Sequence, residues 1–284
     1  MSIVVENLSH IYMKGSPFER KALDNISLVI NQGEFVGIIG HTGSGKSTLI
    51  QHFNGILKPT SGTVVVDGIN TLEKGLKELR KKVGIVFQYP EQQLFEETVY
   101  KDIAFGLKQL NHKEDEIDKK IKNVIRIVGL DESILEKSPF ELSGGQKRRV
   151  AIAGILVMEP SILVLDEPAA GLDPKGRNEI FGFLKKLYDE VKITIIIVSH
   201  NMEEVAKIVN RVIVINKGKI AMDGSPGEIF SDVSTLENIG LSAPQITHLM
   251  KKLKKKVPGL KDDIFIVEEA KMEILRYLKG GTHD

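Results

Sequence analysis

The stretch Gly40-His41-Thr42-Gly43-Ser44-Gly45-Lys46-Ser47-Thr48 decides the fold of this chain. It matches the phosphate-binding loop pattern G-x-x-x-x-G-K-[ST] at every fixed position. The apolar run Phe35–Ile39 before it predicts a buried strand, and Thr48–Phe53 after it predicts the start of a helix. The sequence therefore predicts an α/β protein with a P-loop nucleotide site, rather than a glycine-rich turn without a ligand.

Each fixed residue of this loop has a different predicted role in binding a nucleotide. Gly40, Gly43 and Gly45 let the backbone fold tightly and point its N–H groups inward. The N-terminus of the following helix adds partial positive charge at the same place. Lys46 is predicted to reach the β- and γ-phosphates, and the Ser47 hydroxyl is predicted to hold Mg²⁺.

The composition of the chain limits the class of protein that it can be. The chain has 284 residues, 42% of them hydrophobic and 27% charged, as expected of a globular protein. Its net charge of +1 gives no general electrostatic argument for binding nucleic acid, and the lack of cysteine excludes disulfides and Cys-ligated zinc. No apolar run approaches roughly 18 residues, and no secretion signal is visible. We therefore expect a protein that folds in the cytosol or lies against a membrane from that side.

Two strand patterns precede the phosphate loop. Residues Ser2–Tyr12 form one, and the alternation of Ile26, Leu28 and Ile30 forms the other. An antiparallel pair ahead of a P-loop predicts a β-subdomain attached to the parallel core. Tyr12, at the end of the first strand, either stacks on adenine or packs on its neighbours, and its position alone favours packing.

The middle of the chain changes from strand to helix periodicity. The strand Val83–Phe87 ends at Gln88, whose neutral amide suits contact with Mg²⁺ or the attacking water. A polar loop, Tyr89–Phe95, follows. From Thr98 to about Glu159 the apolar spacing is helical, which predicts a helical insertion in the α/β core.

The last helix of this insertion opens with Ser143-Gly144-Gly145-Gln146. The serine can cap the helix, and the free N–H groups form a second N-terminus suited to phosphate. The motif is weak when it stands alone. A phosphate loop about a hundred residues upstream makes it a strong indication of a second phosphate contact.

Two carboxylates end the next apolar strand, which begins at Ile162. Because side chains alternate along a strand, Asp166 and Glu167 should perform different tasks. Asp166 is predicted to hold Mg²⁺ through its water shell, and Glu167 to orient or deprotonate the attacking water. The alternative is an Asp-Glu-Pro turn at a strand end.

His200 follows the strand Ile193–Ser199. The carboxyl ends of parallel strands form the edge at which α/β sheets bind ligands. A neutral imidazole there can hydrogen-bond the γ-phosphate and the attacking water. We favour this role over that of a structural histidine, because the other strand exits also carry phosphate-directed groups.

Together these motifs resemble those of the ATP-binding-cassette (ABC) ATPases over about residues 1–225. Tyr12 falls where that family has its adenine-stacking aromatic residue, which favours stacking. The other correspondences are Gly40–Ser47 with Walker A, Gln88 with the Q-loop, Leu142–Gln146 with the signature, Ile162–Glu167 with Walker B and its catalytic glutamate, Ala170–Asp173 with the D-loop, and His200 with the switch histidine.

The resemblance implies an ABC-type core with an antiparallel β-subdomain, a helical subdomain at about 89–160, and a mostly helical extension at 226–284. It implies ATP and Mg²⁺ as ligands, with Mg²⁺ near Ser47, Gln88 and Asp166. It also implies head-to-tail pairing with a second ABC ATPase. Ser143, Gly144, Gly145 and Gln146 would then act on the nucleotide of that partner.

A narrower resemblance concerns importers. Phe87–Phe95 and Asp102–Gly106 resemble the ATPases of energy-coupling-factor importers and of their cobalt and nickel relatives. Arg148–Gly154 and Gly171–Arg177 resemble the second ATPase of the vitamin-importing kind. This implies a peripheral protein on the cytoplasmic face of the cell membrane. A membrane coupling subunit would dock near Gln88–Phe95, a substrate-binding membrane subunit would join indirectly, and no nucleic acid would bind.

The expected function is ATP hydrolysis that powers uptake of a vitamin or another micronutrient. The first alternative is a homodimeric ATPase of a cobalt or nickel importer. A non-transport ABC ATPase acting on DNA or ribosomes is disfavoured. Members with long coiled coils carry them in this insertion, which has no sustained heptads, and ribosome-type members usually carry two cassettes in one chain. A small-molecule kinase would have no use for Leu142–Gln146.

The C-terminal part carries two helical apolar stripes and a helix start at Ser225. The stripes predict packing either on the core of the same chain or on a partner ATPase, as in related importers. The lysine cluster Lys251–Lys256 indicates either a solvated face or attraction to anionic lipid. The residues of the stripes are Ile246, Leu249, Met250, Leu253 and Val257, then Ala270, Ile274, Leu275 and Leu278.

Overall fold

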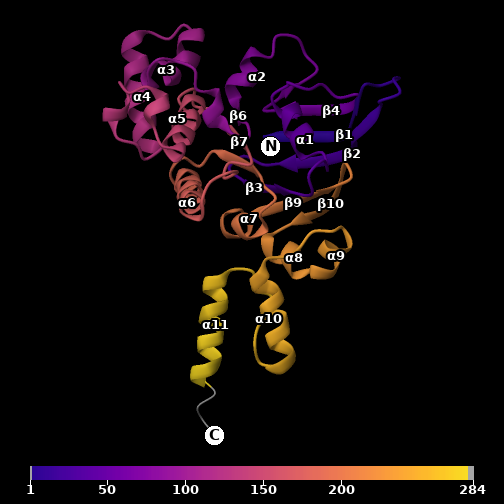
Figure 1. Cartoon of the computed structure of the whole chain (residues 1–284). Helices are drawn as coiled ribbons and strands as arrows, with labels where there is room; N and C mark the ends of the chain where they lie inside the picture. The colour runs from indigo at the N-terminus through magenta and orange to yellow at the C-terminus, as the bar shows by residue number, and fades with distance from the viewer. Residues whose placement is uncertain (1, 281–284) are drawn as a thin grey trace.

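A mainly parallel sheet lies at the centre of the structure, a computed structural model that describes residues 2–280. Its strand order is β10-β9-β3-β8-β7-β6, and only β10 runs antiparallel to its neighbour. Every residue of β3, β7 and β8 is buried, because helices and the second sheet cover both faces (Figure 1). The strands are β3 (Phe35–Ile39), β6 (Val83–Val86), β7 (Ile162–Asp166), β8 (Thr194–Val198), β9 (Arg211–Asn216) and β10 (Lys219–Gly224).

An antiparallel sheet of order β2-β1-β4-β5 lies beside it, which confirms the expected β-subdomain. Its apolar face shares one core with the helix α1 that follows the phosphate loop. That helix begins at Lys46 itself, two residues before the predicted start. The bounds are β1 (Ile3–Tyr12), β2 (Arg20–Ile30), β4 (Ser61–Val66), β5 (Ile69–Asn70) and α1 (Lys46–Phe53).

The predicted helical insertion forms a group of three helices, at the upper left of Figure 1. One difference concerns the expected loop Tyr89–Phe95, which contains the short 3₁₀ helix η1 (Pro90–Gln93). Pro90 starts it because a fixed φ and a missing N–H suit the first helical position. The helices are α3 (Val99–Gln109), α4 (Glu114–Ile127) and α5 (Gly144–Leu156), with η2 (Glu132–Ile134) and η3 (Pro139–Glu141) between the last two.

Further helices connect or flank the core strands. They are α2 (Lys77–Lys82), α6 (Pro174–Val191) and α7 (Met202–Ile208). Two short helices then follow β10, and Ser225 caps the first of them in a capping box with Glu228, as expected. These are α8 (Pro226–Ser231) and α9 (Val233–Asn238).

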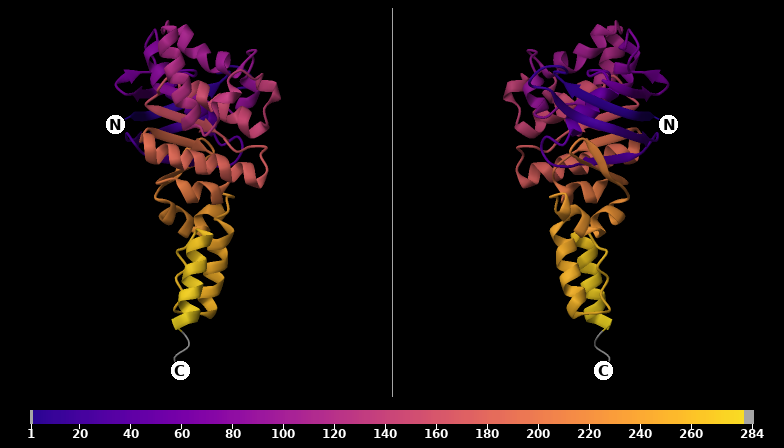
Figure 2. Two further views of the ribbon diagram at one scale, coloured as in Figure 1. Left: turned by 90° about the vertical axis from the view of Figure 1, so that its left-hand side faces the viewer. Right: turned by 90° about the vertical axis from the view of Figure 1, so that its right-hand side faces the viewer.

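The last described residues form two packed helices, α10 (Gln245–Lys256) and α11 (Val267–Gly280), which we call the C-terminal hairpin (residues 245–280). It projects away from the sheets like a stalk (Figure 2). Met250, Leu260, Ile264 and Ala270 form its own small core, separate from the cores of the sheets. The predicted stripes are therefore split: their inner residues pack within the hairpin, while Leu278 is 61% exposed.

Candidate functional site

Four parallel strands end at one edge of the central sheet, and each is followed by a predicted site residue. The phosphate loop follows β3, Gln88 follows β6, Glu167 follows β7, and His200 follows β8. We call residues 40–48, Gln88, Asp166, Glu167 and His200 the phosphate edge. Because parallel strands present their carboxyl ends together, residues far apart in sequence meet there.

Lys46 is buried within the phosphate loop, at 8% exposure. Its ammonium Nζ donates to the carbonyl oxygens of Gly40 at 2.7 Å and His41 at 2.8 Å. Burial lowers the pKa of Lys46, and the negative charges of Glu167 and Asp166 oppose that shift. A buried cation held only by neutral carbonyls is well placed to bind an anion.

The loop glycines are required by close backbone approaches. A Cβ at Gly40 would lie 2.2 Å from the carbonyl oxygen of Ile215, and its φ is +152°. A Cβ at Gly45, with φ +110°, would lie 2.7 Å from the carbonyl oxygen of Ala22. No side chain fits at either position, so the loop keeps its shape only with glycine there.

A cavity of about 180 Å³ opens beside the loop, and Gly43, Gly45, Lys46, Ser47 and Thr48 line it. Tyr12 also lines this cavity, with its hydroxyl 3.2 Å from the Thr48 hydroxyl. Arg20 is a further lining residue that the sequence did not indicate, since it lies at the start of β2, outside every motif.

Ser47 and Asp166 meet at the inner side of the loop. Burial raises the pKa of Asp166, and a hydrogen bond with the Ser47 hydroxyl opposes that shift. A buried carboxylate beside a hydroxyl provides hard oxygen ligands of the kind that Mg²⁺ takes alongside phosphate oxygens. Within residues 2–280 no group of three His, Cys, Asp or Glu side chains is suited to hold a metal, so a cation would need such further oxygens.

A second cavity of about 190 Å³ brings together Gln88, Glu167 and His200. The imidazole Nδ1 of His200 lies 2.9 Å from both carboxylate oxygens of Glu167. The backbone of Glu167 has φ +52°, and its N–H donates to the carbonyl of Val198. This strained turn aims the carboxylate at the imidazole, an arrangement suited to proton transfer with a water molecule.

The signature residues lie apart from these cavities. Ser143 accepts the N–H of Gln146, whose side chain accepts the N–H of Ser143. A Cβ added at Gly144 or Gly145 would meet nothing within 4 Å, so this helix start is open to its surroundings. Ser143, Gly144, Gly145 and Gln146 line neither cavity of the phosphate edge.

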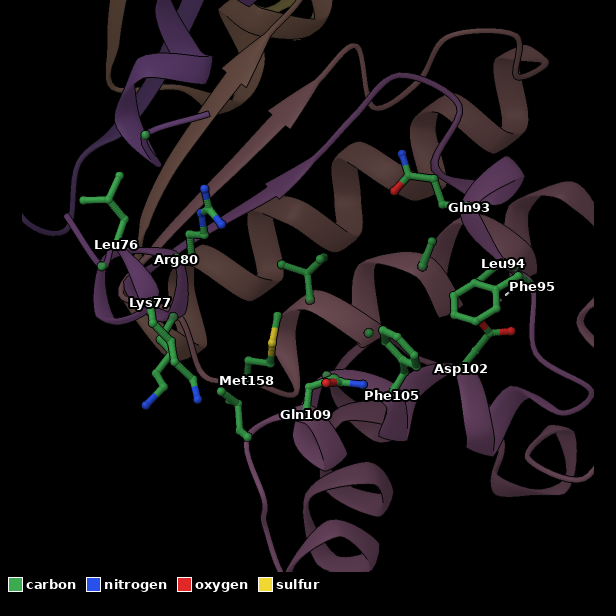
Figure 3. Close-up of a pocket in the computed structure, with 18 of the residues that line it drawn as sticks. Leu76, Lys77, Arg80, Gln93, Leu94, Phe95, Asp102, Phe105, Gln109 and Met158 are labelled. Atoms are coloured by element: carbon green, nitrogen blue, oxygen red, sulfur yellow. Dashed lines mark hydrogen bonds between the residues drawn. The ribbon is translucent and has the colours of Figure 1, made fainter. Parts of the chain in front are cut away.

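A groove of about 1140 Å³ lies between α2, α3 and α5, and we call it the apolar groove (Figure 3). Phe95 and Phe105 form part of its wall, with ring centroids 5.1 Å apart and exposures of 61% and 43%. Lys77 and Arg80 of α2 stand on the opposite side. The docking predicted near Gln88–Phe95 covers only the Gln93–Phe95 part of this wall, because the rest comes from segments far apart in the chain.

A buried pair of histidines supports the loop from behind, and the sequence did not indicate it. The Nε2 atom of His52 lies 3.1 Å from Nδ1 of His10, and Nδ1 of His52 lies 2.7 Å from the Thr48 carbonyl oxygen. Burial lowers the pKa of His52 to about 4. The pair therefore joins β1 to α1 beneath Tyr12 and Thr48.

Comparison with known proteins gives a consistent result. Residues 23–170 match the family model described as ABC transporter. The chain is 65% identical to an energy-coupling factor transporter ATP-binding protein EcfA2 from Acetivibrio thermocellus, over 98% of this chain and 99% of the relative. The protein of the same name from Clostridium tetani is 60% identical over 97% of both chains.

Solved structures agree on the fold. The cbiO1 protein of Clostridium perfringens, described as part of the ABC transporter complex cbiONQ, aligns with a TM-score of 0.75 and 43% identity over 88% of this chain and 98% of its own. The ATP-binding cassette MJ0796, in a dimeric structure bound to ADP and Pi, aligns with a TM-score of 0.69 and 32% identity over 79% and 98%.

These likenesses confirm the predicted ABC-type fold and an ATPase activity coupled to transport. The likeness to the two EcfA2 proteins extends over almost the whole chain, including the C-terminal hairpin. The chain therefore belongs to the ABC transporter family and, within it, to the ATP-binding subunits of energy-coupling factor transporters.

Proposed function

We propose that the phosphate edge hydrolyses Mg²⁺-bound ATP, with Glu167 as the general base. The contact between His200 and both carboxylate oxygens of Glu167, in one cavity with Gln88, carries this proposal. Glu167 accepts a proton from the attacking water, while His200 and Gln88 hydrogen-bond that water and the γ-phosphate. Lys46 and the loop amides stabilise charge on the phosphates.

The metal site that we propose consists of Ser47, Asp166 and Gln88. The Ser47 hydroxyl lowers the pKa of Asp166 against the effect of burial, and this supports the site, because a hydroxyl that acts on a buried carboxylate gives two oxygen ligands beside the loop. The ion supplies charge neutralisation at the β- and γ-phosphates when bound. Tyr12 holds the adenine by stacking, consistent with its place on the wall of the loop cavity.

Pairing with a second ABC ATPase completes the site. The open signature start, Ser143 to Gln146, lines no phosphate cavity of its own chain and has free space around Gly144 and Gly145. It acts on the nucleotide of the partner. The dimeric cassette structures of MJ0796 support such pairing, and the exposed side of the C-terminal hairpin supplies a further contact.

The apolar groove receives a helix of a membrane coupling subunit. Its exposed Phe95 and Phe105 rings give the anchors that a docked helix buries, and Lys77 and Arg80 give a polar rim. None of the helices within residues 2–280 is long and apolar enough to span a bilayer. In this proposal the protein attaches to the cytoplasmic face of the membrane through that subunit, and a substrate-binding membrane subunit joins indirectly.

The cargo is a vitamin or another micronutrient that this chain does not contact. Residues 1–225 act as the nucleotide-binding domain, with the helical subdomain at about 89–160, and residues 226–284 act as the extension. The EcfA2 name of the most similar relatives reported above supports a heteromeric importer. The likeness to cbiO1, part of the ABC transporter complex cbiONQ, is lower at 43% identity, so a homodimeric metal importer is the second candidate.

Affinity purification of the tagged protein from mild-detergent extracts of its own organism tests this. A second, different ABC ATPase together with a membrane protein is the expected result. This ATPase alone with membrane proteins would favour the homodimeric importer. Ribosomal or DNA-bound partners without any membrane protein would contradict the transport proposal.

A pair of variants locates the docking surface in the same experiment. Phe95→Glu places a charge in the apolar groove and should remove the membrane protein from the purified fraction. Phe18→Glu is the matched control, because Phe18 is 79% exposed and lies outside the groove. Equal recovery of the membrane protein with both variants would contradict docking in the groove.

A further inference from the structure

Arg148 is the most deeply buried charged side chain next to the apolar groove, at 1% exposure. It lies in the first turns of α5, the helix that begins with the signature. Its Nε and Nη2 atoms donate to the two carboxylate oxygens of Glu91, at 3.0 and 2.8 Å. Its Nη1 atom donates to the carbonyl oxygens of Pro168 and Ala170, both at 2.9 Å. One guanidinium of α5 thus contacts both η1 and the segment Pro168–Ala170.

The segment that contains Glu91 forms part of the groove wall. Glu91 lies in η1, and the next residues along the chain, Gln93 to Phe95, line the groove. Val150 and Ala151 line it from α5, two and three residues after Arg148 in sequence. The ion pair between Arg148 and Glu91 therefore lies behind the surface on which we propose that the membrane subunit docks.

The segment that contains Pro168 and Ala170 begins at Glu167, the proposed general base. Pro168 follows Glu167 directly, and Ala170 belongs to the D-loop that continues from it. Glu167 holds φ +52°, a conformation that persists only where the surroundings fix it. The two carbonyl contacts of Arg148 fix the residues immediately after this turn.

The chemistry of the site requires arginine. A planar guanidinium can pair with a carboxylate bidentately and still donate to two carbonyls, whereas an ammonium cannot span this arrangement. Burying such a pair gives little net stability, because removing two charges from water offsets their attraction. Its value lies in fixing the relative position of the segments that it joins.

We propose that Arg148 is a positioning residue that links occupancy of the apolar groove to the placement of Glu167. A helix docked against Gln93–Phe95 fixes η1 and hence Glu91. Through Arg148, this fixes the Pro168–Ala170 turn and sets the Glu167 carboxylate for catalysis. This inference rests on the proposed docking of a membrane subunit in the groove.

The test measures ATP hydrolysis by the tagged complex purified with its membrane subunit. Arg148→Lys loses both links, so kcat should fall about tenfold while the KM for ATP stays within about twofold. Glu91→Gln weakens only the groove side. Its kcat in the full complex should fall by more than about twofold but by less than in Arg148→Lys, because the contacts of Arg148 with Pro168 and Ala170 remain.

Arg149→Lys is the matched control. This neighbouring arginine has a carboxylate partner, Glu179, and a single carbonyl partner, Gly129, but it does not contact η1 or the D-loop. Its kcat should equal that of the wild type. Values of kcat for Arg148→Lys and Glu91→Gln within about twofold of wild type would overturn the link, as would a rise in KM that matches the fall in kcat.

The failures of the two proposals can be told apart. A wild-type complex that contains a membrane protein, with unchanged kinetics in both variants, contradicts only the role of Arg148. A wild-type purification that recovers no membrane protein contradicts the docking function, and the link falls with it. Thermal unfolding of each variant identifies a loss of rate that comes merely from unfolding.

Discussion

Charged side chains meet opposite conditions in the phosphate edge and in the C-terminal hairpin. In the phosphate edge, burial lowers the pKa of Lys46 and raises that of Asp166, so both charges are disfavoured by their surroundings. In the hairpin, Glu273 accepts hydrogen bonds from the guanidinium of Arg276 and from the N–H of Lys261. These contacts lower the pKa of Glu273 to about 2.

The difference separates a site that needs a ligand from a segment that satisfies its own polar groups. A phosphate and a cation would pair the buried charges of Lys46 and Asp166. The hairpin has already paired Glu273, and one side of α11 is apolar: Met272, Leu275 and Leu278 are all exposed. We therefore expect small, charged ligands at the first region and a protein surface at the second.

The largest expected effect comes from removing the buried cation. Lys46→Ala should weaken ATP binding about a hundredfold and abolish hydrolysis, because the buried cation that would pair the phosphate charge is lost. Equilibrium binding of a fluorescent ATP analogue, followed by steady-state hydrolysis, measures both effects.

Lys58→Ala is the control for that experiment. Lys58 also donates to two carbonyl oxygens, those of Leu72 and Glu73, but it lies outside the loop cavity. Nucleotide binding should stay at the wild-type level. Equal ATP binding by both variants would contradict the claim that the phosphate edge, unlike the hairpin, needs a charged ligand.

The buried His52 should make the support of the phosphate loop sensitive to acid. Its pKa is about 4 in the folded chain and 6.5 as the ordinary value, so the unfolded chain gains a proton first as the pH falls. Stability is therefore lost as the pH falls from about 6.5 to about 4, by roughly 3 kcal/mol. Urea unfolding across this range measures the loss.

In His52→Gln this acid-dependent loss should disappear, since no imidazole remains to take up the proton. His248→Gln, in the hairpin, serves as the comparison and should keep the wild-type profile. A wild-type profile in His52→Gln would show that the acid sensitivity arises elsewhere.

The smallest effect is expected in the hairpin. Because the pKa of Glu273 is lowered, its contribution is present above about 4.5, the ordinary value, and is lost as the pH falls towards about 2. Glu273→Gln should speed amide hydrogen exchange in α10 and α11 at neutral pH and leave ATP hydrolysis unchanged. The exposed Glu269→Gln should alter neither. Reduced hydrolysis in Glu273→Gln would mean that the hairpin acts on the phosphate edge.

The sequence predicted those features that depend on local pattern. Apolar runs such as Phe35–Ile39 and Ile162–Asp166 predicted the core strands. Motifs with fixed spacing predicted the phosphate loop and the site residues that follow each strand. Their convergence on one edge followed from the way parallel strands align.

Contacts between distant segments were not predictable in this way. Glu91 and Arg148 are 57 residues apart, and His10 and His52 are 42 apart. Each residue on its own reads as an ordinary polar side chain, and only the tertiary fold brings the pairs together. The same holds for the apolar groove, whose wall residues belong to separate helices.

The central claim is that Glu167 activates water at the phosphate edge. The most direct measurement is ATP turnover and ATP binding by Glu167→Gln, beside Glu204→Gln as the control from the same cavity. The account predicts that Glu167→Gln binds ATP within about twofold of wild type and hydrolyses it at least about a hundredfold more slowly, while Glu204→Gln retains turnover. Hydrolysis by Glu167→Gln at the wild-type rate would contradict the account.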